Sequence, residues 1–292
     1  MDWQAAQKEL ATRLSPLYEE REAAVITDWV MEHLSGWKKI DRLLHKSDQL
    51  PPNVKEQLEH YTRELLSNRP VQYVLQESWF GGMKFFVDER VLIPRPETEE
   101  LVDWVVSEVQ SAAPLRGAGS ASAGPLLDVG TGSGCIAISL KKRLSALPVF
   151  ACDISPDALA VARQNASALE ADIHFQQLDF RNNKQWAQLP DVRYLVSNPP
   201  YIPMADKSHM APNVLGFEPH LALFVEDDDP LIFYRSLAAF AGKKLSPEGA
   251  IFAELHEDLA QPVAALMRKN GFPNTTLKKD MQGKERLIKA TR

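Results

Sequence analysis

Residues 126–134 read LLDVGTGSG, an apolar run that passes directly into three glycines separated by single residues. The next segment, residues 135–144, has the apolar spacing of a helix, so the glycines occupy a strand-to-helix turn. Glycines at such a turn let the backbone approach a ligand closely, because no Cβ stands in the way. The stretch therefore predicts the first strand, turn and helix of a parallel sheet that carries a ligand site.

Short β-like runs alternate with helical segments from there to the end of the chain, which is typical of a parallel sheet with crossover helices. The expected strands are residues 126–129, 149–152, 173–177, 194–197 and 250–254, with 275–279 and 286–289 as an antiparallel pair at the end of the sheet. The expected helices are residues 97–111, 135–144, 156–169, 230–241 and 257–270. These elements predict the α/β class.

The first 75 residues have apolar positions at helical spacing and predict a small helical domain. Ser15-Pro16 suits a helix start, Ser35-Gly36 a helix end and Pro51-Pro52 another start. Aromatic and β-branched residues around Gly81-Gly82 indicate a hairpin. We expect a helical domain over residues 1–77, a hairpin linker over 78–95 and an α/β domain over 96–292. Residues 112–125, rich in Ala, Gly, Ser and Pro, are expected to form a mobile surface loop.

Composition excludes several classes of protein. The 292 residues carry a net charge of −6, which argues against nonspecific binding of long nucleic acid but leaves a local basic patch possible. No apolar run is long enough to cross a bilayer, and the first residues lack a signal-peptide pattern, so we expect a cytoplasmic protein without a membrane partner. Cys135 and Cys152 belong to no Cys-x-x-Cys pair or Cys/His cluster, so neither a metal site nor a disulfide is expected.

Asp153 ends the second expected strand, where a carboxylate can accept hydrogen bonds from both hydroxyls of a ribose. Together with the glycine turn it indicates a cofactor that contains adenosine. The spacing Gly-x-Gly-x-Gly differs from the dinucleotide form, which places a pyrophosphate at the helix start, and so favours S-adenosylmethionine. Asp179-Phe180 follows the third strand, where the ring can stack on adenine and the carboxylate can accept from its amine; a core Phe beside a turn Asp is an equal alternative.

Asn198-Pro199-Pro200-Tyr201 follows the fourth expected strand and is the most specific motif in the chain. Two prolines remove two backbone N–H groups and leave carbonyl oxygens exposed. A planar –NH₂ group can donate one hydrogen to Asn198 and one to a prolyl carbonyl, while its π system packs against Tyr201. Such acceptors stabilise the positive charge that develops when an amide or amino nitrogen attacks a sulfonium methyl group. The motif therefore predicts methyl transfer to nitrogen.

The chain closely resembles the HemK/PrmC family, protein-(glutamine-N5) methyltransferases that modify peptide chain release factors. The resemblance extends over almost the whole chain and is carried by the glycine turn and by residues 69–73 (RPVQY), 91–98 (VLIPRPET), 153–156 (DISP) and 197–203 (SNPPYIP). It implies a seven-stranded, Rossmann-like methyltransferase sheet and a helical N-terminal domain that helps to dock the release factor. The implied substrate is the Gln of a Gly-Gly-Gln loop in class I release factors.

The resemblance also implies roles for individual residues. The cofactor contacts are expected to be Gly130, Thr131, Gly132, Ser133, Gly134, Asp153, Asp179, Phe180 and Asn198. The substrate contacts are expected to be Asn198, Pro199, Pro200 and Tyr201, with Arg95, Glu97 and Thr98 as part of the wall near the methyl group. The chain departs from the family pattern at residues 227–230 and 253–256, both of which are expected to lie outside the site.

Three other readings remain open at this point. A methyltransferase acting on the exocyclic amine of adenine in nucleic acid would have a similar motif and sheet, but the acidic balance weighs against it. A binding module that has lost catalysis would be expected to lack the Asn or the glycines. A nicotinamide oxidoreductase is disfavoured by the glycine spacing. We expect a monomer with no stable nucleic acid partner.

Overall fold

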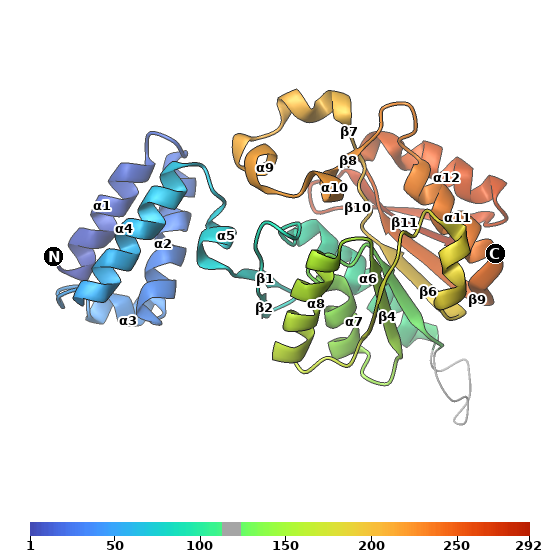
Figure 1. The fold of residues 1–292 in the computed structure, drawn as a ribbon, viewed down its shortest axis with the longest axis horizontal. Helices are drawn as coiled ribbons and strands as arrows, with labels where there is room; N and C mark the ends of the chain where they lie inside the picture. The colour runs from blue at the N-terminus through green and yellow to red at the C-terminus, as the bar shows by residue number, and fades with distance from the viewer. Residues whose placement is uncertain (113–123) are drawn as a thin grey trace. The chain divides into compact units, whose positions relative to one another are not determined.

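The computed structural model of the protein describes residues 1–112 and 124–292. The chain forms two compact units, which are drawn in Figure 1. One unit comprises Met1–Glu77 with Ala211–Phe217, and the other comprises Ser78–Met210 with Glu218–Arg292. The surface loop expected at residues 112–125 falls almost entirely outside the described residues.

The first unit is helical, as the sequence predicts. Its main elements are α1 (Trp3–Leu14), α2 (Glu20–Ser35), α3 (Lys39–Leu44), α4 (Pro52–Leu66) and α5 (Val71–Leu75), with α9 (Pro212–Phe217) from the later segment. Apolar side chains from successive turns of the longer helices are fully buried, among them Leu14, Val30 and Leu65. The end predicted at Gly36 is confirmed, since this residue takes the left-handed conformation that closes α2. The start predicted at Ser15-Pro16 is wrong, because α2 begins at Glu20.

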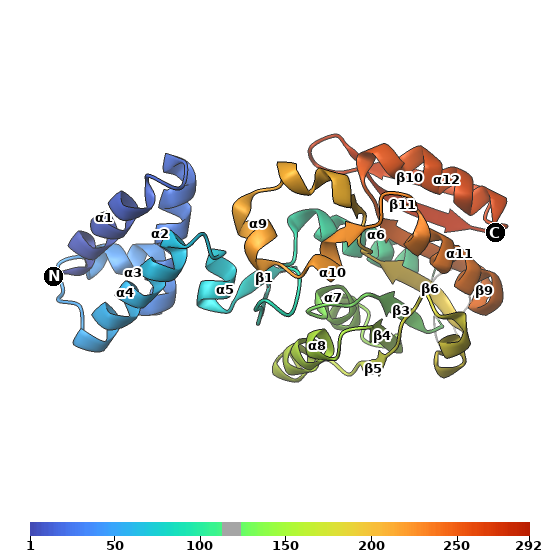
Figure 2. The same cartoon turned by 45° about the horizontal axis from the view of Figure 1, so that its top comes forward.

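The second unit is built on one seven-stranded sheet in the order β10-β11-β9-β6-β3-β4-β5 (Figure 2). Its strands are β3 (Leu126–Val129), β4 (Val149–Asp153), β5 (His174–Gln177), β6 (Val192–Ser197), β9 (Leu245–Glu254), β10 (Asn274–Lys279) and β11 (Glu285–Thr291). The first five are parallel, and β11 pairs antiparallel with both β9 and β10. The predicted strands and the antiparallel end pair are therefore confirmed.

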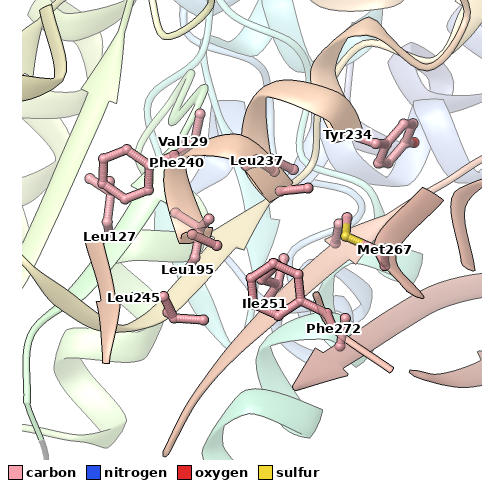
Figure 3. Close-up of a cluster of buried hydrophobic side chains, with 14 of the residues drawn as sticks. Leu127, Val129, Leu195, Tyr234, Leu237, Phe240, Leu245, Ile251, Met267 and Phe272 are labelled. Atoms are coloured by element: carbon pink, nitrogen blue, oxygen red, sulfur yellow. The ribbon is translucent and has the colours of Figure 1, made fainter. Parts of the chain in front are cut away.

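Helices cover both faces of this sheet. Side chains of α6 (Pro96–Ala112), α7 (Cys135–Arg143) and α8 (Pro156–Ala168) form one buried cluster with the strands. On the other face α11 (Ile232–Lys244) and α12 (Ala260–Lys269) form a second cluster, in which Tyr234, Phe240 and Met267 pack over Leu195 and Ile251 (Figure 3). The sheet is thus buried on both sides, which accounts for the nearly continuous apolar runs of its central strands.

Several short elements complete the second unit. The predicted hairpin is present as β1 (Ser78–Phe80) and β2 (Met83–Phe85), and both turn glycines, Gly81 and Gly82, have positive φ. Asn165 fixes the end of the hairpin through two hydrogen bonds to Phe86. Its Oδ1 accepts from the Phe86 N–H, and its Nδ2 donates to the Phe86 carbonyl oxygen. The remaining elements are η2 (Asn183–Gln188), β7 (Ile202–Pro203), η3 (Met204–His209), α10 (His220–Leu223), β8 (Phe224–Val225) and η4 (Glu257–Leu259), with β7 parallel to β8.

Gly249 lies in β9, where a Cβ would stand 2.7 Å from the carbonyl oxygen of Arg193 and 2.6 Å from Leu245. We expect Gly249→Ala to lower the free energy of unfolding by about 1 to 3 kcal/mol, because the backbone of β6 would have to shift. Gly242→Ala is the matched control, since Gly242 is exposed in α11 and a Cβ there meets no atom within 4 Å. We expect the control to gain about 0.5 to 1 kcal/mol. Urea denaturation of both variants measures this, and equal stabilities would contradict it.

Candidate active site

The register of four parallel strands gathers the predicted site at one edge of the sheet. Ser197 of β6 pairs with Val129 of β3 on one side and Ala253 of β9 on the other, and Val129 also pairs with Cys152 of β4. The Ser197 hydroxyl donates to the Val129 carbonyl oxygen at 2.8 Å, which reinforces this register. The residues that come next along each strand therefore lie side by side, at the carboxyl edge where parallel sheets bind ligands.

A pocket opens at this edge. Predicted site residues that line it are Gly130, Gly132, Asp153, Asp179, Phe180, Asn198, Pro199 and Pro200. Sequence reasoning had not included its apolar wall, to which Leu92, Ile154, Leu221 and Phe233 contribute. The two halves of the predicted site, glycine turn and Asn-Pro-Pro loop, thus face one cavity.

The Asp153 carboxylate is fixed by backbone groups. Its Oδ2 accepts from the Gly132 N–H and its Oδ1 from the Ser155 N–H, both at 2.9 Å. Burial raises the pKa of Asp153, and these backbone N–H groups act in the opposite direction. A carboxylate keeps further lone pairs for the two hydroxyls of a ribose.

The glycine turn leaves room for a ligand. Gly130 and Gly132 have φ of +72° and +54°, and a Cβ on either would meet no protein atom within 4 Å. Both line the pocket, so the open space beside them faces the cavity. The turn and Asp153 therefore fit the adenosine and amino acid portions of S-adenosylmethionine.

The other residues of the turn do not line the pocket. A Cβ on Gly134 would lie 3.0 Å from Ile138 and 3.3 Å from Ala162, so this glycine permits the close packing of α7 on α8. The Ser133 carbonyl accepts from the Asn165 amide. The Thr131 hydroxyl donates to Asp128 at 2.6 Å. Their geometry supports the shape of the turn, and their predicted cofactor contact stays a prediction.

Asp128, which sequence reasoning did not include in the site, lies fully buried beneath the turn. Burial raises its pKa to about 7, although the Thr131 hydroxyl favours the charged form. Its Oδ1 has no hydrogen-bond partner among the described residues. The signal in the sequence was an acid within an otherwise apolar strand.

A hydrogen-bonded chain runs behind the Asn-Pro-Pro-Tyr loop. The Asn198 Nδ2 donates to the Thr98 Oγ1 at 3.1 Å, and the Thr98 hydroxyl donates to the Glu254 Oε2 at 2.7 Å. The Tyr201 hydroxyl donates to the other oxygen, Oε1, of Glu254 at 2.9 Å. Glu254, which was expected to lie outside the site, does not line the pocket but bonds two of the predicted site residues. It ends β9, and the rule that pointed to Asp153 at the end of β4 would also have pointed to it.

The remaining predicted residues lie away from the pocket or mostly in the core. Arg95 forms an ion pair with the buried Glu218 at 2.5 Å, and Glu97 accepts a hydrogen bond from Gln282 at 3.2 Å. Of the predicted wall, only Thr98 contacts the Asn198 side chain through a hydrogen bond. Phe180 is only 7% exposed and its ring packs against Trp186 and Phe240, so the pocket receives one edge of a core side chain.

Two family models match the chain, one described as the PrmC N-terminal domain over residues 5–75 and one as the methyltransferase small domain over residues 115–215. A release factor glutamine methyltransferase of Flavobacterium psychrophilum is 41% identical over 276 residues, which are 94% of each chain. The chain belongs to the release factor glutamine methyltransferase family. A second relative with the same description, from Bacteroides thetaiotaomicron, is 37% identical over 96% of each chain.

Solved structures support the fold of this family member. The hMettl16 catalytic domain, solved in complex with the MAT2A 3′UTR hairpin 6, aligns with a TM-score of 0.55 over 83% of this chain and 86% of its own. The two sequences are only 15% identical, so this likeness concerns the methyltransferase fold alone.

In residues 1–112 and 124–292, no three His, Cys, Asp or Glu side chains come together as a metal site. No helix in the same ranges has the length and apolar character that crossing a bilayer requires.

Asp153→Ala is expected to weaken S-adenosylmethionine binding by on the order of 2 to 4 kcal/mol, because hydrogen bonds to a charged acceptor are lost. Titration calorimetry measures this affinity. Asp172→Ala is the matched control, since Asp172 is exposed and does not line the pocket. An unchanged affinity in Asp153→Ala would mean that the ribose is held by other groups.

Asp128 gives the cofactor-free protein a pH-dependent stability. Its pKa of about 7 lies above that of an unfolded Asp, so the folded state binds the proton more tightly. The free energy of unfolding should therefore fall as pH rises from about 4 to about 7, by at most about 1.4 kcal/mol per pH unit. Asp128→Asn should remove this contribution. Chemical denaturation of both proteins across that range tests it, and identical slopes would show that Asp128 does not titrate there.

Proposed function

We propose that the protein transfers the methyl group of S-adenosylmethionine to the side-chain amide nitrogen, N5, of the Gln in the Gly-Gly-Gln motif of class I release factors. The observation that carries the proposal is that Asn198, Pro199 and Pro200 line the same pocket as Gly132 and Asp153. Cofactor-type and amide-accepting groups thus share one cavity. The substrate class is supported by the relatives that cover 94% of the chain and are described as release factor glutamine methyltransferases.

S-adenosylmethionine, when bound, supplies an electrophilic methyl group. The chain's part is to hold a weakly nucleophilic amide, whose lone pair is delocalised into its carbonyl. Asn198 Oδ1 and a prolyl carbonyl accept the two amide hydrogens, which aligns the nitrogen and stabilises its developing positive charge. The proton that the nitrogen loses can pass to water without a strong base, because the nitrogen becomes acidic as the new bond forms. The prolines contribute by leaving no N–H group that would compete for the substrate.

The proposed substrate also fits the walls of the pocket. A Gln at the tip of an extended loop can reach Asn198 only if its neighbours are small, and two glycines carry no Cβ that would strike the prolyl rings. Three residues bury too little surface for a stable complex, so we propose that the helical domain of residues 1–77 binds the release factor elsewhere. We also propose that the enzyme acts as a monomer in the cytoplasm.

Incubation with radiolabelled S-adenosylmethionine and, side by side, release factor, tRNA and DNA tests the substrate class. We expect label only in the release factor, with a gain of about 14 Da, one CH₂, on the Gln of the Gly-Gly-Gln loop by mass spectrometry. A release factor with Gln→Ala in this loop is the control and should stay unlabelled. A short Gly-Gly-Gln peptide should be a far poorer substrate. Label in nucleic acid alone would overturn the proposal.

Asn198→Ala is expected to reduce methyl transfer by about a hundredfold or more, the usual scale for the loss of one preorganised transition-state partner. Binding of S-adenosylmethionine should change little, because Asp153 and the glycine turn remain. Single-turnover kinetics and calorimetry measure the two effects separately. Turnover near the wild-type rate would assign the motif a structural role.

A further inference from the structure

The amide of an Asn side chain has an oxygen end and a nitrogen end, and only the oxygen end suits the substrate. Its Oδ1 can accept an amide hydrogen, whereas its Nδ2 group would oppose the hydrogens of an incoming –NH₂. Some part of the protein must therefore set the direction of the Asn198 amide. Resting on the function proposed above, we propose that Glu254, acting through the Thr98 hydroxyl, is the positioning residue that turns the Asn198 oxygen toward the pocket.

The direction of the Asn198 amide follows from counting the hydrogen-bond donors between Glu254, Thr98 and Asn198. An ionised carboxylate only accepts, so Glu254 takes the single proton of the Thr98 hydroxyl at 2.7 Å. Thr98 then has only lone pairs to offer to Asn198, and the group at 3.1 Å must be the Nδ2 donor. The Asn198 Oδ1 is consequently the end of the amide that points away from Thr98. One negative charge thus sets two successive hydrogen bonds.

Burial makes this direction costly to reverse. Thr98 and Glu254 are each only 2% exposed, so water is a poor substitute for either partner. The Tyr201 hydroxyl donates to the second oxygen of Glu254, so both carboxylate oxygens already accept a hydrogen bond. The Tyr234 hydroxyl donates to the Glu254 carbonyl oxygen, so it holds the backbone without contacting the carboxylate.

Protonation of Glu254 would allow the opposite arrangement. A neutral carboxyl could donate to Thr98, which could in turn donate to an Asn198 whose amide had rotated by half a turn. The pocket would then present an –NH₂ group to the substrate amide. Methyl transfer should therefore be present above the pKa of Glu254 and be lost as pH falls through it.

The surroundings of Glu254 raise its pKa above the ordinary value of a glutamate, so we expect the loss of activity at a correspondingly higher pH. Burial is the largest influence and raises its pKa, and the Glu97 carboxylate on α6 adds to the rise. The Thr98 and Tyr201 hydroxyls and the Arg286 guanidinium on β11 act against it. His256, two residues further along, has its ring 6.2 Å from that of Tyr201 and is the nearest histidine to consider in a pH profile.

The test uses full-length protein and single-turnover methylation of a release factor. We expect Thr98→Val, which removes only the hydroxyl, to lower the rate by about tenfold or more, and Thr98→Ser to restore it to within about threefold of wild type. KM for the release factor and affinity for S-adenosylmethionine should hardly change. Tyr234→Phe is the matched control, because it removes a buried hydroxyl bond to Glu254 without altering the carboxylate, and its rate should stay within about twofold.

Glu254→Gln and the pH profile give an independent readout. The wild-type rate should fall on the acid side through an ionisation that is absent from Glu254→Gln. His256→Gln is the control for the neighbouring histidine and should leave that fall in place.

The outcomes separate the two proposals. A wild-type enzyme that does not label the release factor contradicts the proposed function. Three results with an active wild type would overturn the positioning role alone. They are a Thr98→Val rate near that of wild type, a Tyr234→Phe rate as low as that of Thr98→Val, and the same acid fall in Glu254→Gln. Should Thr98→Val fail to fold, the pH profiles of wild type and Glu254→Gln decide the matter.

Discussion

Parallel pairing of β6 with β3 on one side and β9 on the other is the constraint on which the site depends. With Ser197 held opposite both Val129 and Ala253, Asn198 must emerge between Gly130 and Glu254. A strand shifted by one residue would reverse the faces of its side chains and separate these groups. The two covering layers of helices stabilise this register by burying both faces of the strands.

The sheet and cofactor half of the site could be predicted because their signals are local. LLDV before the glycines, and Asp153 after the next strand, are each recognisable within a few residues, and the parallel pairing follows from the alternation of strands and helices. The same local reasoning placed Phe180 near the pocket but could not show that most of its ring belongs to the core. Exposure is decided by Trp186 and Phe240, which approach from other elements.

Glu254 was missed for the opposite reason, since its partners are remote in sequence. Thr98 lies 156 residues away and Tyr201 lies 53 residues away, and neither separation forms a motif. The departure from the family pattern at residues 253–256 carries no information about what the Glu254 carboxylate contacts. The same holds for Arg95, which the family resemblance assigned to the wall near the methyl group. Its ion-pair partner, Glu218, is 123 residues away in the sequence and could not be predicted from a local pattern.

The active site therefore combines a preformed glycine turn for the cofactor with an acceptor loop in which Glu254 and Thr98 set the direction of the Asn198 amide. Its central claim concerns which atom of Asn198 faces the substrate amide. A high-resolution crystal structure with S-adenosylhomocysteine and a release factor measures this most directly. We expect the Gln side-chain nitrogen within hydrogen-bond distance of the Asn198 Oδ1 and of a prolyl carbonyl, with the Asn198 Nδ2 still on Thr98. A Gln seated outside this pocket, or an Asn198 that turns its Nδ2 toward this Gln, would contradict the claim.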